Sequence, residues 1–250
     1  MKQKIRLIAP LVTEGLRLDE YVADLSDAQV EVSAVILETG PASVEGSFDE
    51  ALAVPGVVNR VIEAEQEGCA AAIIDCMSDP GLEAAREVAA MPVFGPAQTS
   101  MHVASTIGHR FSMLAVLGRQ ISLFDGLAAK YGVAGNMASV RSVEIPVLEL
   151  EKNPGLLCEG LVRQAILAVE EDGADTVILG CTGLAGLAGQ VRDGLAAEKV
   201  MDVLVVDPIE STVAFAAGIL KCGLGHSKRV FSQPRQKRIV GYDVPGRSAE

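Results

Sequence analysis

Residues Ala70–Gly81 have the sequence AAAIIDCMSDPG, which combines an apolar run, a cysteine and a turn signal. The five small or branched apolar residues Ala70–Ile74 are too few for an independent helix and predict a short strand buried on both faces. Asp79 is a favourable helix N-cap, and Pro80 suits the first helical position. Cys76 is therefore expected at the carboxyl end of a strand and beside a helix N-terminus, where a thiolate is favoured.

A second segment, Thr176–Leu187, repeats this pattern with the sequence TVILGCTGLAGL. An apolar strand again precedes a cysteine, Cys181, and small residues follow it. Helices are predicted over 81–90 and 184–197, after the two cysteines. A single cysteine that follows an apolar run is usually a core residue. Its repetition in both halves of the chain favours a functional pair.

Strands and helices alternate along the rest of the chain. The predicted strands are 4–9, 30–37, 70–74, 93–95, 111–117, 139–145, 176–180 and 203–207. Such alternation predicts parallel sheets with right-handed crossovers. We expect an α/β fold of two similar Rossmann-like domains, with mostly parallel sheets and an active-site cleft between the domains. The tail, residues 226–250, is basic and contains two prolines, and we expect it to pack over a domain or over a neighbouring subunit.

The composition excludes several classes of partner. The 250 residues carry a net charge of −12, which argues against nucleic acids and anionic membranes, because both require clustered Lys and Arg. No apolar run reaches the roughly twenty residues that span a bilayer. The N-terminus, MKQKIRLIAP, enters a strand directly and lacks the pattern of a signal peptide. We therefore expect a cytoplasmic protein that acts on a small molecule.

The five cysteines form no recognisable disulfide or metal-binding pattern. Their number is odd, and in a reducing compartment free thiols are expected. The sequence contains no Cys-x-x-Cys pair and no cluster of histidines, so we predict no metal site. Cys69, Cys158 and Cys222 lack the strand–turn–helix context of the other two and are interpreted as structural.

Two cysteines on opposite sides of a substrate can invert a stereocentre next to a carbonyl. The reaction requires one group to remove a proton from one face and another to return a proton to the opposite face. Cysteine suits both roles, because its reference pKa is about 8.5 and its surroundings readily lower it. This chemistry also explains two domains, with one thiol on each wall of a cleft.

Five motifs resemble those of the aspartate/glutamate/hydantoin racemase family, and most closely its hydantoin and allantoin racemase branch. They are GPASVEGSFDEALA (Gly40–Ala53), DCMSDPGLEAAREV (Asp75–Val88), SMHVAS (Ser100–Ser105), LGCTGLA (Leu179–Ala185) and GLGHSK (Gly223–Lys228). The resemblance implies a racemase without a cofactor, with Cys76 and Cys181 as its two acid/base groups. It also implies a homo-oligomer and a tail that returns to the first domain. We therefore predict a first domain of residues 1–97 and 209–250 and a second domain of residues 98–208.

The candidate substrate-binding residues lie beside the cysteines and in two loops. They are Pro10, Ser43, Met77, Ser78, Thr182 and Gly183. Backbone amides near Ser78, Thr182 and Gly183 are expected to bind a carboxylate or enolate oxygen, as amides at a helix start do. The hydantoin branch usually has Asn-Pro-Asn after its first strand, where this chain has Ala9-Pro10-Leu11. The pocket is therefore expected to be less polar there. We expect a carbon acid as substrate, either of hydantoin type or a related compound that is neither a simple hydantoin nor allantoin.

Three alternatives remain at this point. An aspartate or glutamate racemase usually continues its second motif as Gly-Cys-Thr-His, where this chain has Gly183 in place of the histidine. A cis–trans isomerase of the same family would use one cysteine to add covalently to an alkene. A ligand-binding protein without activity is also compatible with the scaffold, since a fold does not fix a function.

Overall fold

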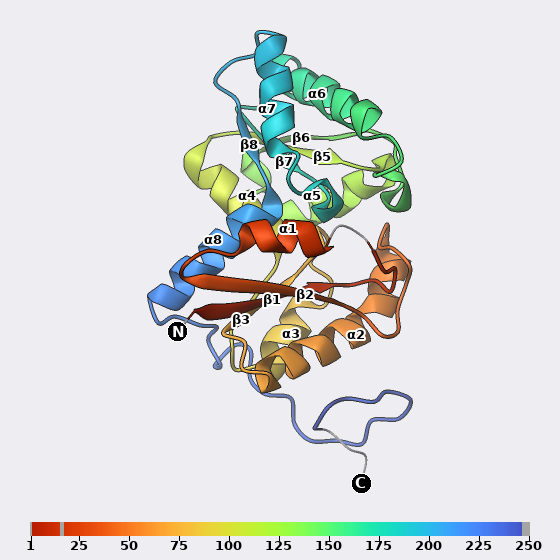
Figure 1. The fold of residues 1–250 in the computed structure, drawn as a ribbon, viewed down its shortest axis with the longest axis vertical. Helices are drawn as coiled ribbons and strands as arrows, with labels where there is room; N and C mark the ends of the chain where they lie inside the picture. Colours follow the sequence, from red (N-terminus) through yellow and green to blue (C-terminus); the bar gives the residue numbers. More distant parts are fainter. Residues whose placement is uncertain (1, 16–17, 247–250) are drawn as a thin grey trace. The chain divides into compact units, whose positions relative to one another are not determined.

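The computed structural model describes residues 2–15 and 18–246, and these residues form two four-stranded parallel sheets flanked by helices (Figure 1). This architecture confirms the predicted α/β fold. The elements of the first half are β1 (Gln3–Ala9), α1 (Leu18–Leu25), β2 (Val30–Ile36), α2 (Ser47–Gln66), β3 (Ala71–Ile74), α3 (Leu82–Val88), β4 (Val93–Phe94) and α4 (Pro96–Ile107). None of the described helices is long and apolar enough to cross a membrane.

The second half repeats the same succession of elements. It contains β5 (Phe111–Ala115), α5 (Ile121–Lys130), β6 (Met137–Ser142), α6 (Pro154–Glu170), β7 (Thr176–Leu179), α7 (Ala188–Ala197), β8 (Leu204–Val206) and α8 (Pro208–Lys221). The strand orders are β2-β1-β3-β4 and β6-β5-β7-β8, and every neighbouring pair is parallel. The two sheets therefore have one topology, in which β3 and β7 occupy equivalent places.

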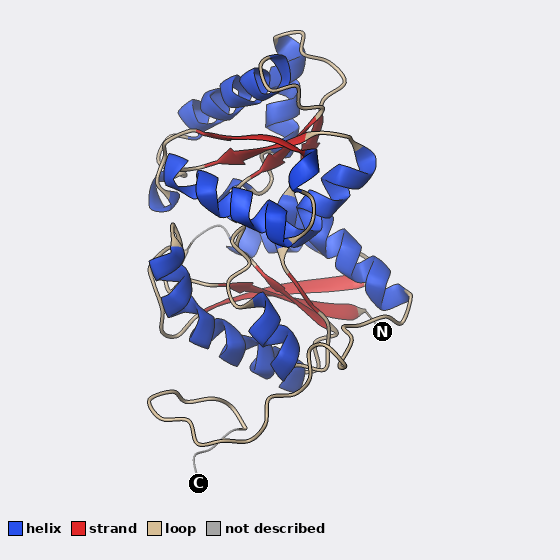
Figure 2. Ribbon diagram, turned by 180° about the vertical axis from the view of Figure 1, so that it is seen from behind, coloured by secondary structure: helices blue, strands red, loops and turns tan. Residues whose placement is uncertain are grey.

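The chain forms two compact units that are not continuous in sequence. The first comprises Met1–Asp75, Asp79–Gly95 and Val213–Glu250, and the second Cys76–Ser78 and Pro96–Thr212. Each unit contains one sheet between helices, which the view from behind also shows (Figure 2). The short segment that begins with Cys76 thus leaves the strand of one unit and packs with the other.

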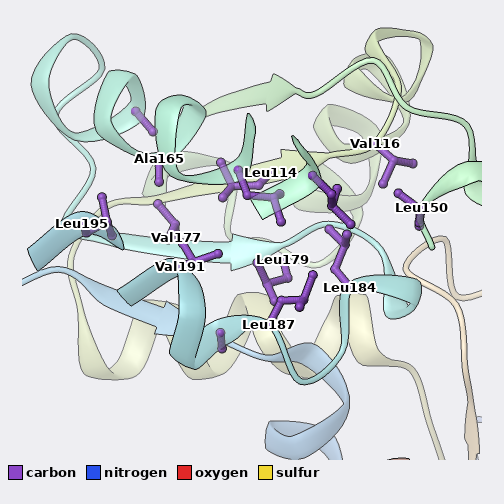
Figure 3. Close-up of a cluster of buried hydrophobic side chains, with 14 of the residues drawn as sticks. Leu114, Val116, Leu150, Ala165, Val177, Leu179, Leu184, Leu187, Val191 and Leu195 are labelled. Atoms are coloured by element: carbon purple, nitrogen blue, oxygen red, sulfur yellow. The ribbon is translucent and has the colours of Figure 1, made fainter. Parts of the chain in front are cut away.

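The sheet of the second unit is buried on both faces, as expected for parallel strands between helices. Leu114 and Leu179 point to the face covered by α6 and α7, where they join a cluster of buried side chains (Figure 3). Met113 and Ile178 point to the opposite face and pack in a second cluster with α4 and α5. This alternation follows from the two-residue period of a strand. Two apolar layers therefore fix the carboxyl ends of β5 and β7.

The C-terminal segment after α8 is fixed to the first unit at the free edge of β4. Nε2 of His226 lies 2.7 Å from the carbonyl oxygen of Val93 and 2.9 Å from its amide nitrogen. Lys228 donates to the carbonyl oxygens of Arg86 and Ala89. The His226 ring also contacts aromatic rings on both sides. The segment covers a strand edge that would otherwise be open to pairing with another chain.

The burial of His226 predicts a loss of stability in mild acid. Burial and the nearby positive charge of Arg86 lower the pKa of His226 to about 4, with a further contribution from Lys228 and an opposing one from the Val93 hydrogen bond. An unfolded histidine has a pKa of about 6.5, so the unfolded chain binds the proton first. The stabilisation is complete above pH 6.5 and is lost as the pH falls toward 4.

Urea unfolding of the wild type and of His226→Gln at pH 7 and pH 5 tests this effect, since glutamine does not titrate. The wild type is expected to lose about 1 kcal/mol more between the two pH values than the variant, after a discount for the partial exposure of the ring. His102→Gln, at an exposed position, serves as the control. Equal pH dependence in the wild type and His226→Gln would contradict the prediction.

Candidate active site

The two candidate cysteines follow equivalent strands. Cys76 comes two residues after the end of β3, and Cys181 two residues after the end of β7. Both strands are fully buried, whereas both thiols are partly exposed. Carboxyl ends of parallel strands are where open α/β sheets bind ligands. Each cysteine is therefore placed at the edge of its sheet where chemistry is expected.

The helices after the cysteines begin differently from the sequence prediction. Gly81, with φ of +73°, is the N-cap of α3, so the assignment of Asp79 as the cap is wrong. After Cys181 the chain makes a single 3-10 turn over Thr182–Leu184, and α7 begins only at Ala188 rather than at 184. The effect of a helix dipole is confined to its first turn, which neither thiol reaches in sequence. Both cysteines are therefore followed directly by short turns, and the helices begin later in the sequence.

The loop of Cys76 is held by its next residue. Met77 is almost completely buried and belongs to the apolar cluster of the second unit that includes Met113 and Ile178. Sγ of Cys76 lies 3.3 Å from Oγ of Ser78, within hydrogen-bonding distance. Met77 thus serves as an anchor for the loop, and Ser78 places a hydroxyl group beside the thiol.

The loop of Cys181 is held by two leucines. Leu184 and Leu187 are buried in the cluster on the side of α6 and α7, as the close-up shows (Figure 3). Gly183 lies close to the thiol, because a Cβ added there would be 3.4 Å from Sγ of Cys181 and 2.9 Å from Cδ1 of Leu150. A larger residue at 183 would press on Leu150 and reach the sulfur. Glycine leaves the surroundings of the Cys181 thiol open.

The remaining candidates, Pro10 and Ser43, lie in loops at the carboxyl edge of the first sheet. These loops follow β1 and β2 and are joined by hydrogen bonds, including Val12 N to Pro41 O at 3.0 Å and Thr13 Oγ1 to Ala42 O at 2.7 Å. Pro10 and Ser43 belong to the first unit, whereas all the other candidates belong to the second. The cleft between the domains stays a prediction.

Glu144 is a charged residue at the edge of the second sheet that the sequence analysis did not identify. It follows β6 with φ of +57°, and its carboxylate accepts hydrogen bonds from Gly118 N at 2.9 Å and from Ser142 Oγ at 2.5 Å. Gly118 lies in the loop after β5, so these contacts join the ends of two neighbouring strands. Only its place after a strand marks Glu144 in the sequence. An anionic group thus lies at the same sheet edge as Cys181.

The other thiols differ from the candidate pair. Burial raises the pKa of Cys69 and of Cys158, so both stay protonated at neutral pH. Cys222 is exposed after the end of α8. Within the described part of the chain, no group of three or more His, Cys, Asp or Glu side chains could hold a metal ion.

Comparisons with a protein-family model, with known proteins and with solved structures give results that agree with one another. Residues 12–216 match the model of the Asp/Glu/hydantoin racemase family. The hydantoin racemase of Pseudomonas sp. (strain NS671) is 37% identical over 95% of this chain and 94% of its own length. The hydantoin racemase of Rhizobium meliloti is 35% identical over 96% of this chain and 98% of its own length. Among solved structures, the allantoin racemase from Klebsiella pneumoniae matches with a TM-score of 0.89 at 32% identity, covering 96% of this chain and 97% of that one.

Proposed function

The chain belongs to the Asp/Glu/hydantoin racemase family, and we propose that it is a cofactor-independent racemase, an isomerase, that acts on a hydantoin-type ring. Support comes from relatives named hydantoin racemase and from a similar structure named allantoin racemase, all of which match over nearly the whole chain. In such a ring the carbon to be inverted lies beside a carbonyl. Removal of its proton gives an enolate, which can be protonated from either face.

In the proposed mechanism Cys76 and Cys181 exchange protons with the two faces of that carbon. One begins as a thiolate and removes the proton, and the other begins as a thiol and returns one to the opposite face. The reverse reaction exchanges the two roles. The observation that carries the proposal is the placement of both partly exposed thiols after equivalent strands, β3 and β7. A purely structural cysteine would have no reason to recur at this position.

Stabilisation of the enolate is assigned to polar groups of the two cysteine loops. The Ser78 hydroxyl lies next to the Cys76 sulfur, and Thr182 and Gly183 form the turn that begins at Cys181. Donors directed at a developing negative charge lower the barrier by more than they lower the energy of the ground state. Pro10 and Ser43, from the loops of the first sheet, are proposed to contact the rest of the ring.

Glu144 favours a neutral substrate over an amino acid. Its carboxylate lies at the carboxyl edge of the sheet that carries Cys181. The N–H groups of a hydantoin can donate hydrogen bonds to this carboxylate, whereas a substrate carboxylate cannot. This is our reason for preferring a ring substrate over aspartate or glutamate.

Proton NMR of the purified protein in deuterated buffer, with polarimetry, tests the proposal. The panel comprises single enantiomers of 5-substituted hydantoins, allantoin, aspartate and glutamate, together with maleate. A hydantoin-type compound is expected to lose the signal of its ring C5 proton and its optical rotation together. Because hydantoins exchange slowly without a catalyst, the Cys76→Ser/Cys181→Ser double variant provides the background rate.

The other outcomes each contradict the proposal in a different way. Exchange of the α-proton of aspartate or glutamate alone would make the protein an amino-acid racemase. Formation of fumarate from maleate would make it a cis–trans isomerase. A rate no higher than that of the double variant with every compound would favour a binding protein without activity.

A further inference from the structure

A single buried carboxylate joins the Cys181 loop to the start of α8. Asp207 is 4% exposed and lies between β8 and α8. Its Oδ1 caps the helix by accepting the amides of Ile209 and Glu210, at 2.9 and 3.1 Å. Its Oδ2 accepts the amide of Gly186 at 2.7 Å. Gly186 stands five residues after Cys181 and has φ of +81°, a conformation that favours glycine.

An aspartate and a glycine are also joined in the first half of the chain. Asp79, also 4% exposed, lies three residues after Cys76 and has φ of +49°. Its carboxylate packs directly on Gly95, where an added Cβ would be 2.4–2.6 Å from the carboxyl carbon and both oxygens. Gly95 lies between β4 and α4. A side chain at position 95 would therefore force this carboxylate out of its place.

The two halves therefore contain the same kind of contact between an aspartate and a glycine, but the two residues have exchanged places. In each, an aspartate–glycine pair joins the loop after the cysteine to the residue that lies between the following strand, β4 or β8, and its helix, α4 or α8. The aspartate comes from the loop in the first half and from the helix start in the second. Because the residues differ at each place, the connection is not a by-product of repeated sequence.

We propose that Asp79 and Asp207 are positioning residues, which hold the thiols of Cys76 and Cys181, respectively, in the geometry for proton transfer. The role rests on the proposed racemase function. The apolar anchors of the loops, Met77 on one side and Leu184 with Leu187 on the other, fix their depth in the core. The buried Asp207 carboxylate accepts directional hydrogen bonds that fix the course of the backbone as well, and the Asp79 carboxylate restricts its loop by its close contact with Gly95. Proton transfer is sensitive to such placement, since an error of about 1 Å can cost about a hundredfold in rate.

The variant Asp207→Ser separates the two roles of this carboxylate. Serine still caps a helix, but it is too short to reach Gly186. In Asp79→Gly the left-handed backbone is retained and the contact of the carboxylate with Gly95 is lost. Each variant is expected to lower kcat about tenfold or more with a smaller change in KM, since an interaction that positions a reacting group acts mainly on the chemical step.

The decisive readout is the alkylation rate of each cysteine with iodoacetamide, measured by peptide mass mapping. Asp207→Ser is expected to raise the rate at Cys181 severalfold and to leave that at Cys76 unchanged, whereas Asp79→Gly is expected to raise the rate at Cys76 and to leave that at Cys181 unchanged. Exposed Cys222 is the internal reference. This measurement needs no substrate, so it decides the positioning role even if the wild type proves inactive and the proposed function fails.

Asn153→Ala is the matched control for the loss of a helix cap. Asn153 caps α6 in the same unit by accepting the amide of Leu156 at 3.1 Å, and α6 does not follow a candidate cysteine. This control is expected to lower Tm without changing either alkylation rate or kcat. If Asp207→Ser behaves in the same way, Asp207 only caps its helix and the inference is overturned. Asp207→Asn, closer in shape, replaces Asp207→Ser if the serine variant does not fold.

Discussion

Replacing Cys181 with serine is expected to lower the rate of racemisation about a thousandfold or more, and the same loss is expected for Cys76→Ser. Serine has nearly the shape of cysteine, so the loops anchored by Met77 and by Leu184 should keep their conformation. A serine hydroxyl, however, is such a weak acid that it stays protonated at neutral pH. It therefore cannot act as the base that removes the substrate proton. Circular dichroism and thermal unfolding establish that each variant is folded before its rate is measured.

The two single variants are further expected to show opposite partial reactions. Each retains one thiol, which still removes the proton from one enantiomer and returns deuterium to the same face. One variant should therefore exchange the ring proton of one enantiomer without inverting it, and the other variant should do so with the opposite enantiomer. NMR on separate enantiomers measures this. Cys222→Ser, at an exposed position, should keep full activity. Exchange of both enantiomers by one single variant would disprove the division of roles.

Replacing Gly180 with alanine is expected to impair both stability and activity. An added Cβ would lie 2.8 Å from the carbonyl oxygen of Leu114 and 3.1 Å from Cα of Ala115, both backbone atoms of β5. The amide of Gly180 also donates to that oxygen at 2.9 Å, which holds the strands together. Backbone cannot rotate away as a side chain can, so the end of β7 must move. Because Cys181 is the next residue, its thiol moves as well.

The expected destabilisation is about 1–3 kcal/mol, the usual cost of overpacking, with a fall in kcat of about tenfold or more. Urea unfolding and initial rates measure the two effects. Gly126→Ala is the matched control, because Gly126 lies in α5 and an added Cβ there contacts nothing. It should leave activity unchanged and raise stability by about 0.5–1 kcal/mol. A Gly180→Ala variant with wild-type stability and activity would contradict the prediction. It would show that the ends of β5 and β7 can move apart without any loss of stability.

Local patterns were sufficient to predict the fold. The apolar runs that became β3 and β7 were bounded to within a residue, because a short run buried on both faces has few other possible structures. Their repetition also identified the two cysteines as equivalent. The start of α7 was predicted four residues too early, because the left-handed Gly186 and the insertion of Leu184 into the core interrupt the expected helix.

The parts of the candidate site that the sequence did not predict depend on contacts between distant residues. Asp79 has the composition of a helix cap, yet its carboxylate packs on Gly95. The bond from Gly186 to Asp207 and the contact of Glu144 with Gly118 each span more than twenty residues. No local periodicity encodes such pairs. These contacts can be recognised only in the folded structure, where the ends of the strands lie at one edge of the sheet.

The division of the chain into its compact units has a consequence for biosynthesis. The first unit takes its residues from both ends of the chain, whereas nearly all of the second comes from the continuous stretch Pro96–Thr212. A ribosome therefore releases the complete second unit while the first still lacks Val213–Lys221 of α8 and the segment that carries His226. During that interval the edge of β4 is uncovered and Phe94 lacks its contact with Phe215. The half of the protein that is made first is thus the last to be completed, and its exposed strand edge is the part most in need of protection by a chaperone.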